Sequence, residues 1–263
     1  MIRQLAPLIL TLFLLACSDD EVKTDPFADW TALDFYEEAT SSLQAGEFEE
    51  AIRNLENLEA RFPFSSYARQ AQLDVAYAYY KFEEPESAIA AADRFIRINP
   101  RDKNVDYAWY LKGLADYNRG TGFLDSFFPR DLSLHDNKSM RDALRSFSIL
   151  VERYPDSRYA IDAYQHMVYL RNKLAEAEIH AANYYIKRKA WLAAANRGKF
   201  VLENYPTTPA SREGLKIMIR AYNALDLPDL AADAQHVLDT NTGVKQKEAE
   251  IENTELEAPN SIP

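Results

Sequence analysis

The chain has 263 residues, 47% of them hydrophobic, which is enough for one large domain or an extended repeat array. Its formal net charge of −11 disfavours a general attraction to nucleic acid or to an anionic membrane face, so any basic site must be local. A single cysteine leaves disulfide, zinc and thiol-redox roles without a second sulfur.

Residues 1–16 have the pattern of a bacterial secretory signal peptide, because Arg3 gives a positive start and an apolar run follows from Leu5 to Ala16. At about 1.5 Å per residue this run makes roughly 18 Å of helix, too short for about 30 Å of hydrocarbon. The run ends in Leu-Leu-Ala-Cys17, which resembles a lipobox. The resemblance implies cleavage before Cys17 and covalent diacylglyceryl and N-acyl lipid on this residue, with no other cofactor. The alternative is a chance cysteine in an ordinary signal peptide.

The next segment, residues 17–30, is polar and acidic, and it is predicted to be a flexible tether. When stretched, Ser18 to Asp29 reaches about 40 Å at roughly 3.3 Å per residue. In lipoproteins of this class, an aspartate after the cysteine retains the protein in the inner membrane. Ser18 stands there instead, so the resemblance implies an anchor in the outer membrane, with the rest of the chain facing the periplasm.

An internal repeat occupies residues 31–243. Four repeats end in a proline that closes a helix pair, and twelve positions earlier each of these has an alanine where two helices cross closely. The prolines are Pro63, Pro100, Pro155 and Pro206, and the alanines are Ala51, Ala88, Ala143 and Ala194. Glycine is rare and strand-like alternation is absent. The pattern predicts an all-α, right-handed superhelix of about five tetratricopeptide-like pairs, about ten helices in all.

Two pairs depart from the common length. In the third pair, Ala143 comes 18 residues late, which indicates an insertion over roughly 119–138 that contains several apolar residues. The fourth pair opens on a stretch without proline or glycine, 157–189, which predicts one helix of up to about 30 residues. Its predicted apolar face is Ile161, Tyr164, Val168, Leu174, Ala181, Ala182 and Tyr185.

Residues 211–224 and 230–238 make a fifth pair without a closing proline, as expected of a terminal repeat. Residues 244–263 are rich in glutamate with almost no apolar periodicity, so we expect an acidic disordered tail that folds only on a partner.

Catalysis finds little support in the sequence, and we expect the protein not to be an enzyme. The four histidines are scattered and none has a two-histidine metal-binding spacing. No phosphate-binding loop or nucleophile elbow is present. Stacked helix pairs instead form a concave groove of the kind that binds peptides or proteins. Several aromatic residues of the second and third pairs belong either to that groove or to the core: Tyr77, Tyr79, Tyr80, Tyr107, Trp109 and Tyr110.

The chain resembles the BamD family of lipoproteins of the β-barrel assembly machinery, from the lipobox to about Gly243. The residues that carry the resemblance are Arg61-Phe-Pro-Phe64 with Tyr67 and Gln70, Tyr77-Ala-Tyr-Tyr-Lys81, Arg94-Phe-Ile-Arg97, Asp106-Tyr107 with Gly113-Leu114, Tyr184-Tyr185 with Arg188, and Ala194-Ala-Asn-Arg197. The resemblance implies a scaffold that binds the POTRA region of BamA. It also implies contact with BamC-type and BamE-type lipoproteins and with unfolded outer-membrane β-barrel proteins, the clients.

For BamA, the resemblance points to Arg197, with Asn196 and Arg188 beside it. An arginine can pair bidentately with a partner carboxylate, although an exposed helix arginine needs no partner.

For clients, the candidate groove consists of Pro63, Phe64, Tyr67, Arg94 and Arg97, because aromatic pockets beside arginines suit a chain end that carries an aromatic ring and a carboxylate. The alternative is that Phe64 and Tyr67 pack between the first two repeats while Arg94 or Arg97 caps a helix. A different function from the same architecture also stays open, namely a tetratricopeptide lipoprotein adaptor for another envelope process such as peptidoglycan maintenance.

Overall fold

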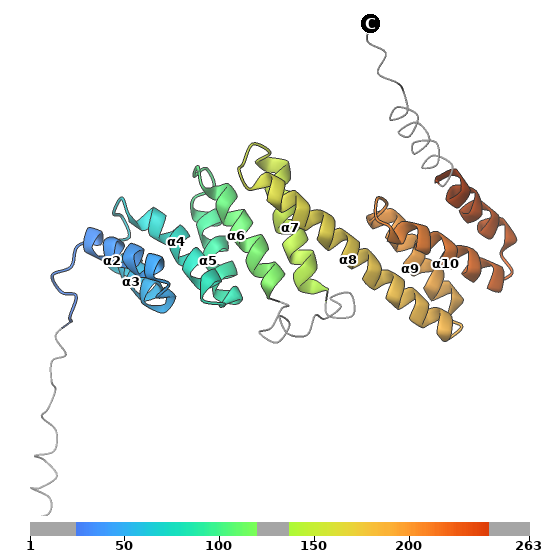
Figure 1. Ribbon diagram of the computed structural model, residues 1–263, viewed down its shortest axis with the longest axis horizontal. Helices are drawn as coiled ribbons and strands as arrows, with labels where there is room; N and C mark the ends of the chain where they lie inside the picture. The colour runs from blue at the N-terminus through green and yellow to red at the C-terminus, as the bar shows by residue number, and fades with distance from the viewer. Residues whose placement is uncertain (1–24, 120–136, 242–263) are drawn as a thin grey trace, which may run out of the picture.

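The computed structural model describes residues 25–119 and 137–241, and this part of the chain is an array of α-helices without a β-strand (Figure 1). The helices are α2 (Ala32–Ala45), α3 (Phe48–Arg61), α4 (Ala68–Lys81), α5 (Pro85–Ile98), α6 (Val105–Asn118), α7 (Lys138–Arg153), α8 (Ala160–Lys187), α9 (Trp191–Asn204) and α10 (Ala210–Ala224). Residues 228–241 form one more helix. Each helix from α2 to α10 packs against the next one in the chain, which confirms the predicted all-α repeat superhelix.

Four turns within pairs are described by the structure, and they share one conformation. A residue in the left-handed region follows the first helix at Gly46 (φ 80°), Glu83 (φ 61°), Lys189 (φ 58°) and Asp226 (φ 58°). The next amide then donates a hydrogen bond five residues back into the helix, as from Glu47 to the carbonyl of Ser42 at 2.8 Å. This arrangement satisfies carbonyl groups that a helix end leaves open. It also reverses the chain within a few residues, so the two helices of each pair lie antiparallel.

The loops between pairs share a second conformation, which follows from the repeated proline. Two residues after it stands Ser65, Asp102, Ser157 or Thr208. The backbone carbonyl of this residue accepts from the amide three residues later, as in Ala68 to Ser65 at 3.2 Å and Ala160 to Ser157 at 3.0 Å. Because short polar residues readily make such turns, every pair enters the next at a similar angle. The four loops therefore lie along the same edge of the array.

The core consists of clusters that follow one another along the array. The first surrounds Phe35, Leu55 and Phe95, and the second surrounds Phe147 and Leu170. Small residues set the helix spacing where the predicted alanines lie, since Ala51, Ala88, Ala143 and Ala194 are all at most 1% exposed. The aromatic residues left open between core and groove are partly buried and pack against the first two clusters. They therefore belong mainly to the packing of the second and third pairs.

Helix α8 has 28 residues, close to the predicted length, and it connects the two ends of the array (Figure 1). Its first half contributes Ala163, Leu170 and Leu174 to the second cluster, and its second half contributes Ala182 and Ile186 to a third. The predicted apolar face is wrong for this first half. Ile161, Tyr164 and Val168 are 77%, 57% and 44% exposed, because α7 packs on a different side of the helix.

The predicted tether is shorter than residues 17–30, because residues 25–30 pack onto the first pair. The rings of Phe27 and Trp30 lie 5.6 and 4.9 Å from the ring of Phe35, and Asp25 forms an ion pair with Arg61 at 2.6 Å. The predicted signal peptide, Cys17, residues 120–136 of the predicted insertion and the tail 244–263 lie outside the described residues. None of the described helices is both long enough and apolar enough to cross a membrane.

Candidate partner-binding surfaces

Phe64 is the most exposed large hydrophobic residue of the described chain, at 100%. It follows Pro63 in the loop between α3 and α4, and the equivalent positions after the other three prolines hold Arg101, Asp156 and Thr207. The fold therefore does not require an aromatic residue at this position. An exposed ring costs free energy in water, since burying it would be worth roughly 1.5–3 kcal/mol. Contact with a partner would offset this cost.

The other predicted client-binding residues divide into two kinds. Tyr67 packs its ring 5.2 Å from the ring of Tyr36 on α2, and Arg94 on α5 forms an ion pair with Glu59 on α3 at 2.7 Å. These two side chains hold the first two pairs together, as the alternative interpretation expected for Tyr67. Pro63, Phe64 and Arg97 are exposed. Among the described residues, no hydrogen bond, ion pair or ring contact joins any two of the five.

In the ion pair of Arg94 with Glu59, the glutamate is the more buried partner. Burial raises the pKa of Glu59, and the nearby Arg94 guanidinium opposes that rise. The Arg94 side chain itself is 43% exposed, so a face of the guanidinium with N–H donors remains open to a ligand. Arg94 can therefore serve both the packing of α3 on α5 and the recognition of a carboxylate.

The predicted BamA-binding residues lie where α8 meets α9. The guanidinium of Arg197 on α9 donates to Glu178 on α8 at 2.7 Å, and this hydrogen bond is the main reason that the pKa of Arg197 is raised. Its side chain is still 43% exposed. Asn196 beside it is exposed, and Arg188 at the end of α8 lies over the ring of Tyr184 at 5.0 Å. The pair with Glu178 fixes the direction of Arg197 while leaving donors for a partner.

A charged cluster not predicted from the sequence surrounds the ends of the insertion. Arg119 forms ion pairs with Asp142 at 2.9 Å and with Asp116 at 3.2 Å, and Lys138 reaches Asp142 at 2.6 Å. Asp116 is only 2% exposed and one of its oxygens has no partner. Burial raises the pKa of this carboxyl to about 6. The cluster joins the ends of α6 and α7 next to residues 120–136. A basic residue at each end of the insertion was the available sequence signal.

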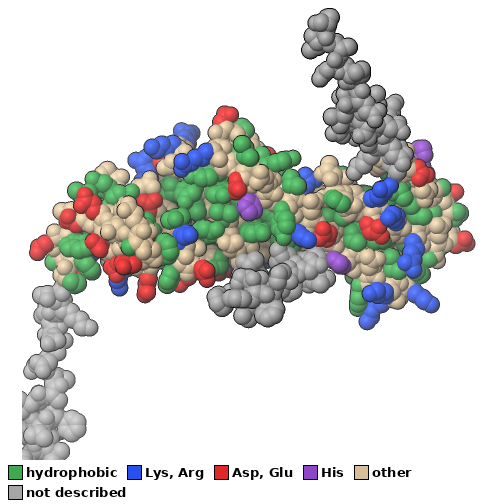
Figure 2. All heavy atoms as spheres, in the orientation of Figure 1, with side chains coloured by type: hydrophobic (Ala, Val, Ile, Leu, Met, Phe, Trp, Pro, Cys, Tyr) green, Lys and Arg blue, Asp and Glu red, His purple; other side chains and the backbone are tan. Residues whose placement is uncertain are grey.

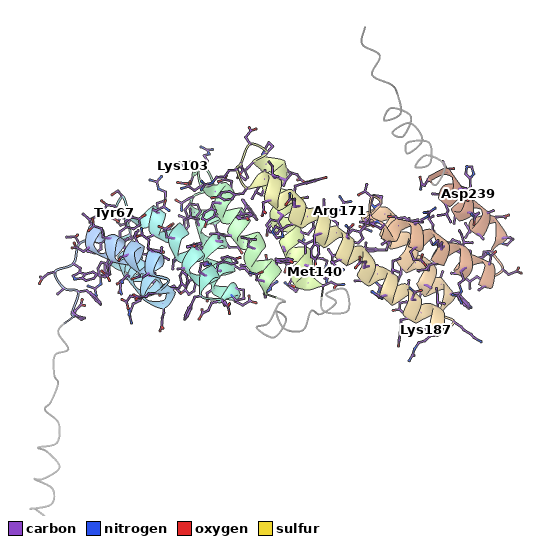
Figure 3. The ribbon with its side chains drawn as sticks, viewed as in Figure 1. Tyr67, Lys103, Met140, Arg171, Lys187 and Asp239 are labelled. Atoms are coloured by element: carbon purple, nitrogen blue, oxygen red, sulfur yellow. The ribbon has the colours of Figure 1, made fainter. Side chains whose placement is uncertain are left out.

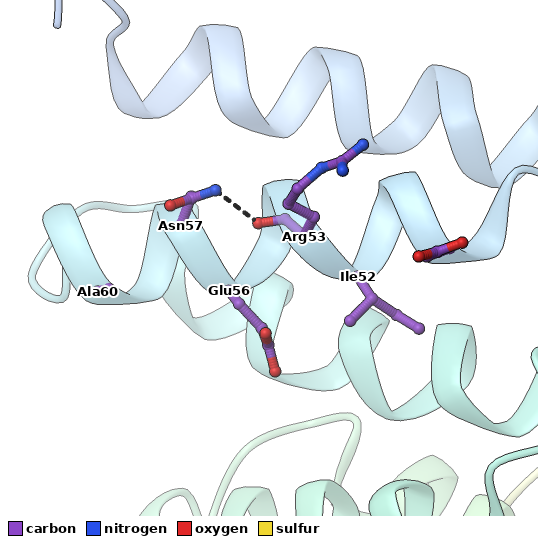
Figure 4. Close-up of a pocket in the computed structure, with 6 residues that line it drawn as sticks. Ile52, Arg53, Glu56, Asn57 and Ala60 are labelled. Carbon is purple, nitrogen blue, oxygen red and sulfur yellow. Dashed lines mark hydrogen bonds between the residues drawn. The ribbon is translucent and has the colours of Figure 1, made fainter. Parts of the chain in front are cut away.

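A hollow of about 410 Å³ lies on the outer side of α3, lined by Glu49, Ile52, Arg53, Glu56, Asn57 and Ala60 (Figure 4). All of these residues come from one helix. Asn57 donates to the backbone carbonyl of Arg53 at 2.9 Å, and Glu56 accepts from Tyr79 at 2.6 Å. Because Asn57 and Glu56 already have partners within the chain, the hollow does not bring together a set of residues for chemistry.

Charged and apolar groups are spread unevenly over the surface. On the face shown in Figure 2, hydrophobic side chains gather over the middle of the array, and acidic groups are frequent on the first pairs. Lys187 ends α8 at the lower edge in Figure 3, whereas Lys103 lies in a loop between pairs at the opposite edge. Basic groups therefore occur locally at both edges of an acidic protein.

Comparison with known proteins places the whole array in one family. The family model described as "Outer membrane lipoprotein" (YfiO) matches residues 28–238. The chain is 45% identical over 213 residues to "Outer membrane protein assembly factor BamD" of Neisseria gonorrhoeae, with 81% of this chain and 80% of the relative covered. The proteins of that name from Vibrio cholerae and Haemophilus influenzae are 35% and 37% identical, with 91% of this chain and 98% and 90% of the relatives covered. The chain belongs to the YfiO family of outer membrane lipoproteins.

Proposed function

We propose that this protein is an assembly factor for outer-membrane proteins, anchored in the outer membrane by lipid on Cys17 and exposed to the periplasm. In this role it is a non-catalytic scaffold that binds the POTRA region of BamA and receives unfolded β-barrel clients. The observation that carries the proposal is the match to BamD relatives along the entire helical array, at up to 45% identity over 213 residues.

The scaffold works by position. The periplasm supplies no ATP, so the free energy for insertion comes from folding and lipid burial of the client. Binding a client and BamA to one array raises the local concentration of each near the other. The two candidate surfaces are suited to this role because they lie at different ends of the array, Phe64 before α4 and Arg197 on α9.

Arg197 gives the sharpest test of the BamA contact. Arg197→Glu removes the donors and places a carboxylate beside Glu178, so we expect the affinity for a purified POTRA fragment of BamA to fall at least tenfold in a binding titration. Glu178→Gln is the matched control, because it breaks the same internal pair but keeps the cation. This control should bind within about threefold of the parent.

Circular dichroism should show both variants folded. Equal affinities of Arg197→Glu and the parent would remove Arg197 from the interface. A pulldown of the lipidated protein from detergent-solubilised membrane tests the function itself: BamA should co-purify in stoichiometric amount. Recovery of a cell-wall enzyme in its place would favour the peptidoglycan adaptor.

Phe64 provides the equivalent test for clients. Phe64→Ser should reduce the affinity for a peptide that carries the C-terminal residues of a β-barrel client, with its terminal carboxylate and aromatic ring, by roughly tenfold. Leu192→Ser is a matched control, because Leu192 is also exposed, at 62%, but lies on α9. If both variants bind the peptide as the parent does, the groove does not include Phe64.

A further inference from the structure

Two apolar triplets lie on one side of α8, one towards each end of the helix. Ile161, Tyr164 and Val168 are spaced by three and four residues, so they lie on one side of the helix. Eighteen residues later, which is five full turns, stand Ile179, Ala182 and Ile186. The two triplets therefore belong to one straight row on the same side of α8.

The two halves of this row have different surroundings. Ala182 and Ile186 are buried in the third core cluster, together with Ala194 and Ala195 of α9 and Ile217 of α10. Ile161, Tyr164 and Val168 are exposed, although the side chains are as apolar as those of the covered half. Helix α9 has 14 residues, half the length of α8, and it covers only the second half of the row. Among the described residues, no helix is docked on the first half, although it has the apolar character of the covered half.

The end of the described chain lies on the same edge of the array as this open surface. Helix α10 begins beside the middle of α8, where Ala210 packs with Ala175. The last helix, 228–241, runs back along α10 after the turn at Asp226 (Figure 1). Residue 241 therefore returns towards the edge at which α10 begins. The 22 residues that follow reach roughly 70 Å at about 3.3 Å each, which exceeds the roughly 42 Å length of α8.

The charges of this segment complement those around the row. Arg158 precedes the open triplet and Arg171 follows it, and Asp162 between them already accepts a hydrogen bond from Tyr110 at 2.7 Å. Residues 242–263 hold five glutamates and two lysines. Glu250 and Glu252 flank Ile251, and Glu255 and Glu257 flank Leu256. The segment therefore has apolar residues between acidic ones, and the open triplet has apolar residues between two arginines, so their charges are complementary.

We propose that residues 242–263 dock on the open half of the α8 row, with Ile251 or Leu256 against Ile161, Tyr164 and Val168 and the glutamates near Arg158 and Arg171. The family model ends at residue 238, so this is a contact of this chain beyond the matched region. Covalent attachment gives the segment a high effective concentration, so a weak contact is sufficient to cover the surface. The inference does not depend on the proposed function.

The first test measures the accessibility of Tyr164. In a full chain with Cys17→Ser, which removes the only cysteine, Tyr164→Cys places one thiol in the row. Deleting residues 242–263 should raise its rate of alkylation by a maleimide at least fivefold, and so should changing the four glutamates around Ile251 and Leu256 to lysine. Ile98→Cys, at a residue 56% exposed on α5, is the matched control, and its rate should not change with either alteration.

The second test is a crosslink in the same Cys17→Ser chain. Tyr164→Cys with Ile251→Cys should form a disulfide within one chain at low protein concentration, and faster than Ile98→Cys with Ile251→Cys. A disulfide between two chains would assign the surface to a second copy and overturn the proposal. Equal alkylation of Tyr164→Cys with and without residues 242–263 would overturn it too. Because Tyr164 is more than half exposed, its substitution leaves the core in place.

Discussion

At the scale of single residues, the burial of the Asp116 carboxyl costs free energy. This carboxyl is almost fully buried, its Oδ2 atom accepts no hydrogen bond, and Arg119 lies at 3.2 Å from its other oxygen. Removing a carboxylate from water disfavours the charged form, and one nearby cation compensates only in part. The raised pKa, about 6, is the result of this incomplete compensation.

Asp116 therefore makes stability depend on pH. Because its pKa is higher in the folded chain than its ordinary 3.8, the folded state binds a proton that the unfolded state has already released between about pH 4 and 6. The stabilisation from that proton is present below about pH 4 and is lost as the pH rises through about 6. Relative to the parent, Asp116→Asn should thus gain on the order of 2 kcal/mol in unfolding free energy from pH 4 to pH 7.5.

Urea unfolding of both proteins at several pH values measures this difference. Other carboxylates titrate over the same range, but they are common to both proteins and cancel in the comparison. A difference between variant and parent that stays constant from pH 4 to 7.5 would show that Asp116 is ionised throughout.

Arg197 and Arg94 are each held by an ion pair with a glutamate of another helix. Each arginine is 43% exposed and pairs with a less exposed glutamate. Arg197 on α9 pairs with Glu178 on α8, which is 15% exposed, and Arg94 on α5 pairs with Glu59 on α3, which is 11% exposed. Fixing a long side chain in advance reduces the conformational entropy lost on binding. The sequence identified both arginines through a family resemblance, whereas only the structure provides their internal partners, because these lie 19 and 35 residues away.

At the scale of elements, α9 and α10 cross closely at Gly198 and Gly214. A Cβ atom on Gly198 would come within 2.6 Å of the carbonyl oxygen of Gly214, whereas one on Gly214 would come no nearer than 3.1 Å to the oxygen of Gly198. The backbone of one helix thus lies directly on the other. This crossing holds α9, and with it Arg197, in position.

Gly198→Ala should therefore destabilise the protein by about 1–3 kcal/mol, because the added methyl group meets backbone that cannot move aside. Gly214→Ala is the matched control: the overlap is smaller and alanine favours a helix by about 1 kcal/mol, so its net effect should be smaller. Thermal unfolding followed by circular dichroism measures both. A Gly198→Ala protein as stable as the parent would indicate that the two helices can separate without cost.

The sequence predicted the positions of the helices and loops better than the burial of their side chains. The loops between pairs were located from the four repeated prolines, because a proline cannot continue a helix. Each proline stands one residue after the C-cap of α3, α5, α7 or α9. The apolar face of α8 was predicted from periodicity, but the prediction combined residues from different sides of the helix: Ile161, Tyr164 and Val168 share one side, whereas Leu174 packs with Leu170 in the second cluster. The first three are exposed, since periodicity cannot tell how far a neighbouring helix extends.

At the scale of the whole molecule, we propose that attachment to the membrane depends on lipid on Cys17. A three-chain lipid contributes about 0.8 kcal/mol for each buried methylene group, which is far more than a single acyl chain provides. We therefore expect Cys17→Ala to move the protein from the membrane fraction to the soluble fraction. The measurement is fractionation in cells in which BamA is depleted.

Depletion of BamA is needed because a partner can retain an unlipidated protein. Parent protein under the same depletion is the control and should stay in the membrane fraction. If Cys17→Ala also remained with the membrane, the anchor would have to lie elsewhere in the chain.

The array also sets how its two candidate surfaces act together. Neighbouring helices contact one another all along the described chain, so Phe64 and Arg197 are joined by a continuous set of packed helices. The predicted tether extends only to about residue 24, because residues 25–30 pack on α2 and α3.

By itself, the sequence determined the repeat, the helix pairs, the long helix and the family, because prolines, small residues and apolar spacing act locally and recur along the chain. The tertiary structure alone decided which apolar residues are covered, which arginines are held by glutamates and which carboxylate is buried. Those properties depend on where the next helices lie across the array. The open half of the α8 row is the clearest case, since α9 and α10 pack on the second half of the row and leave the first half exposed.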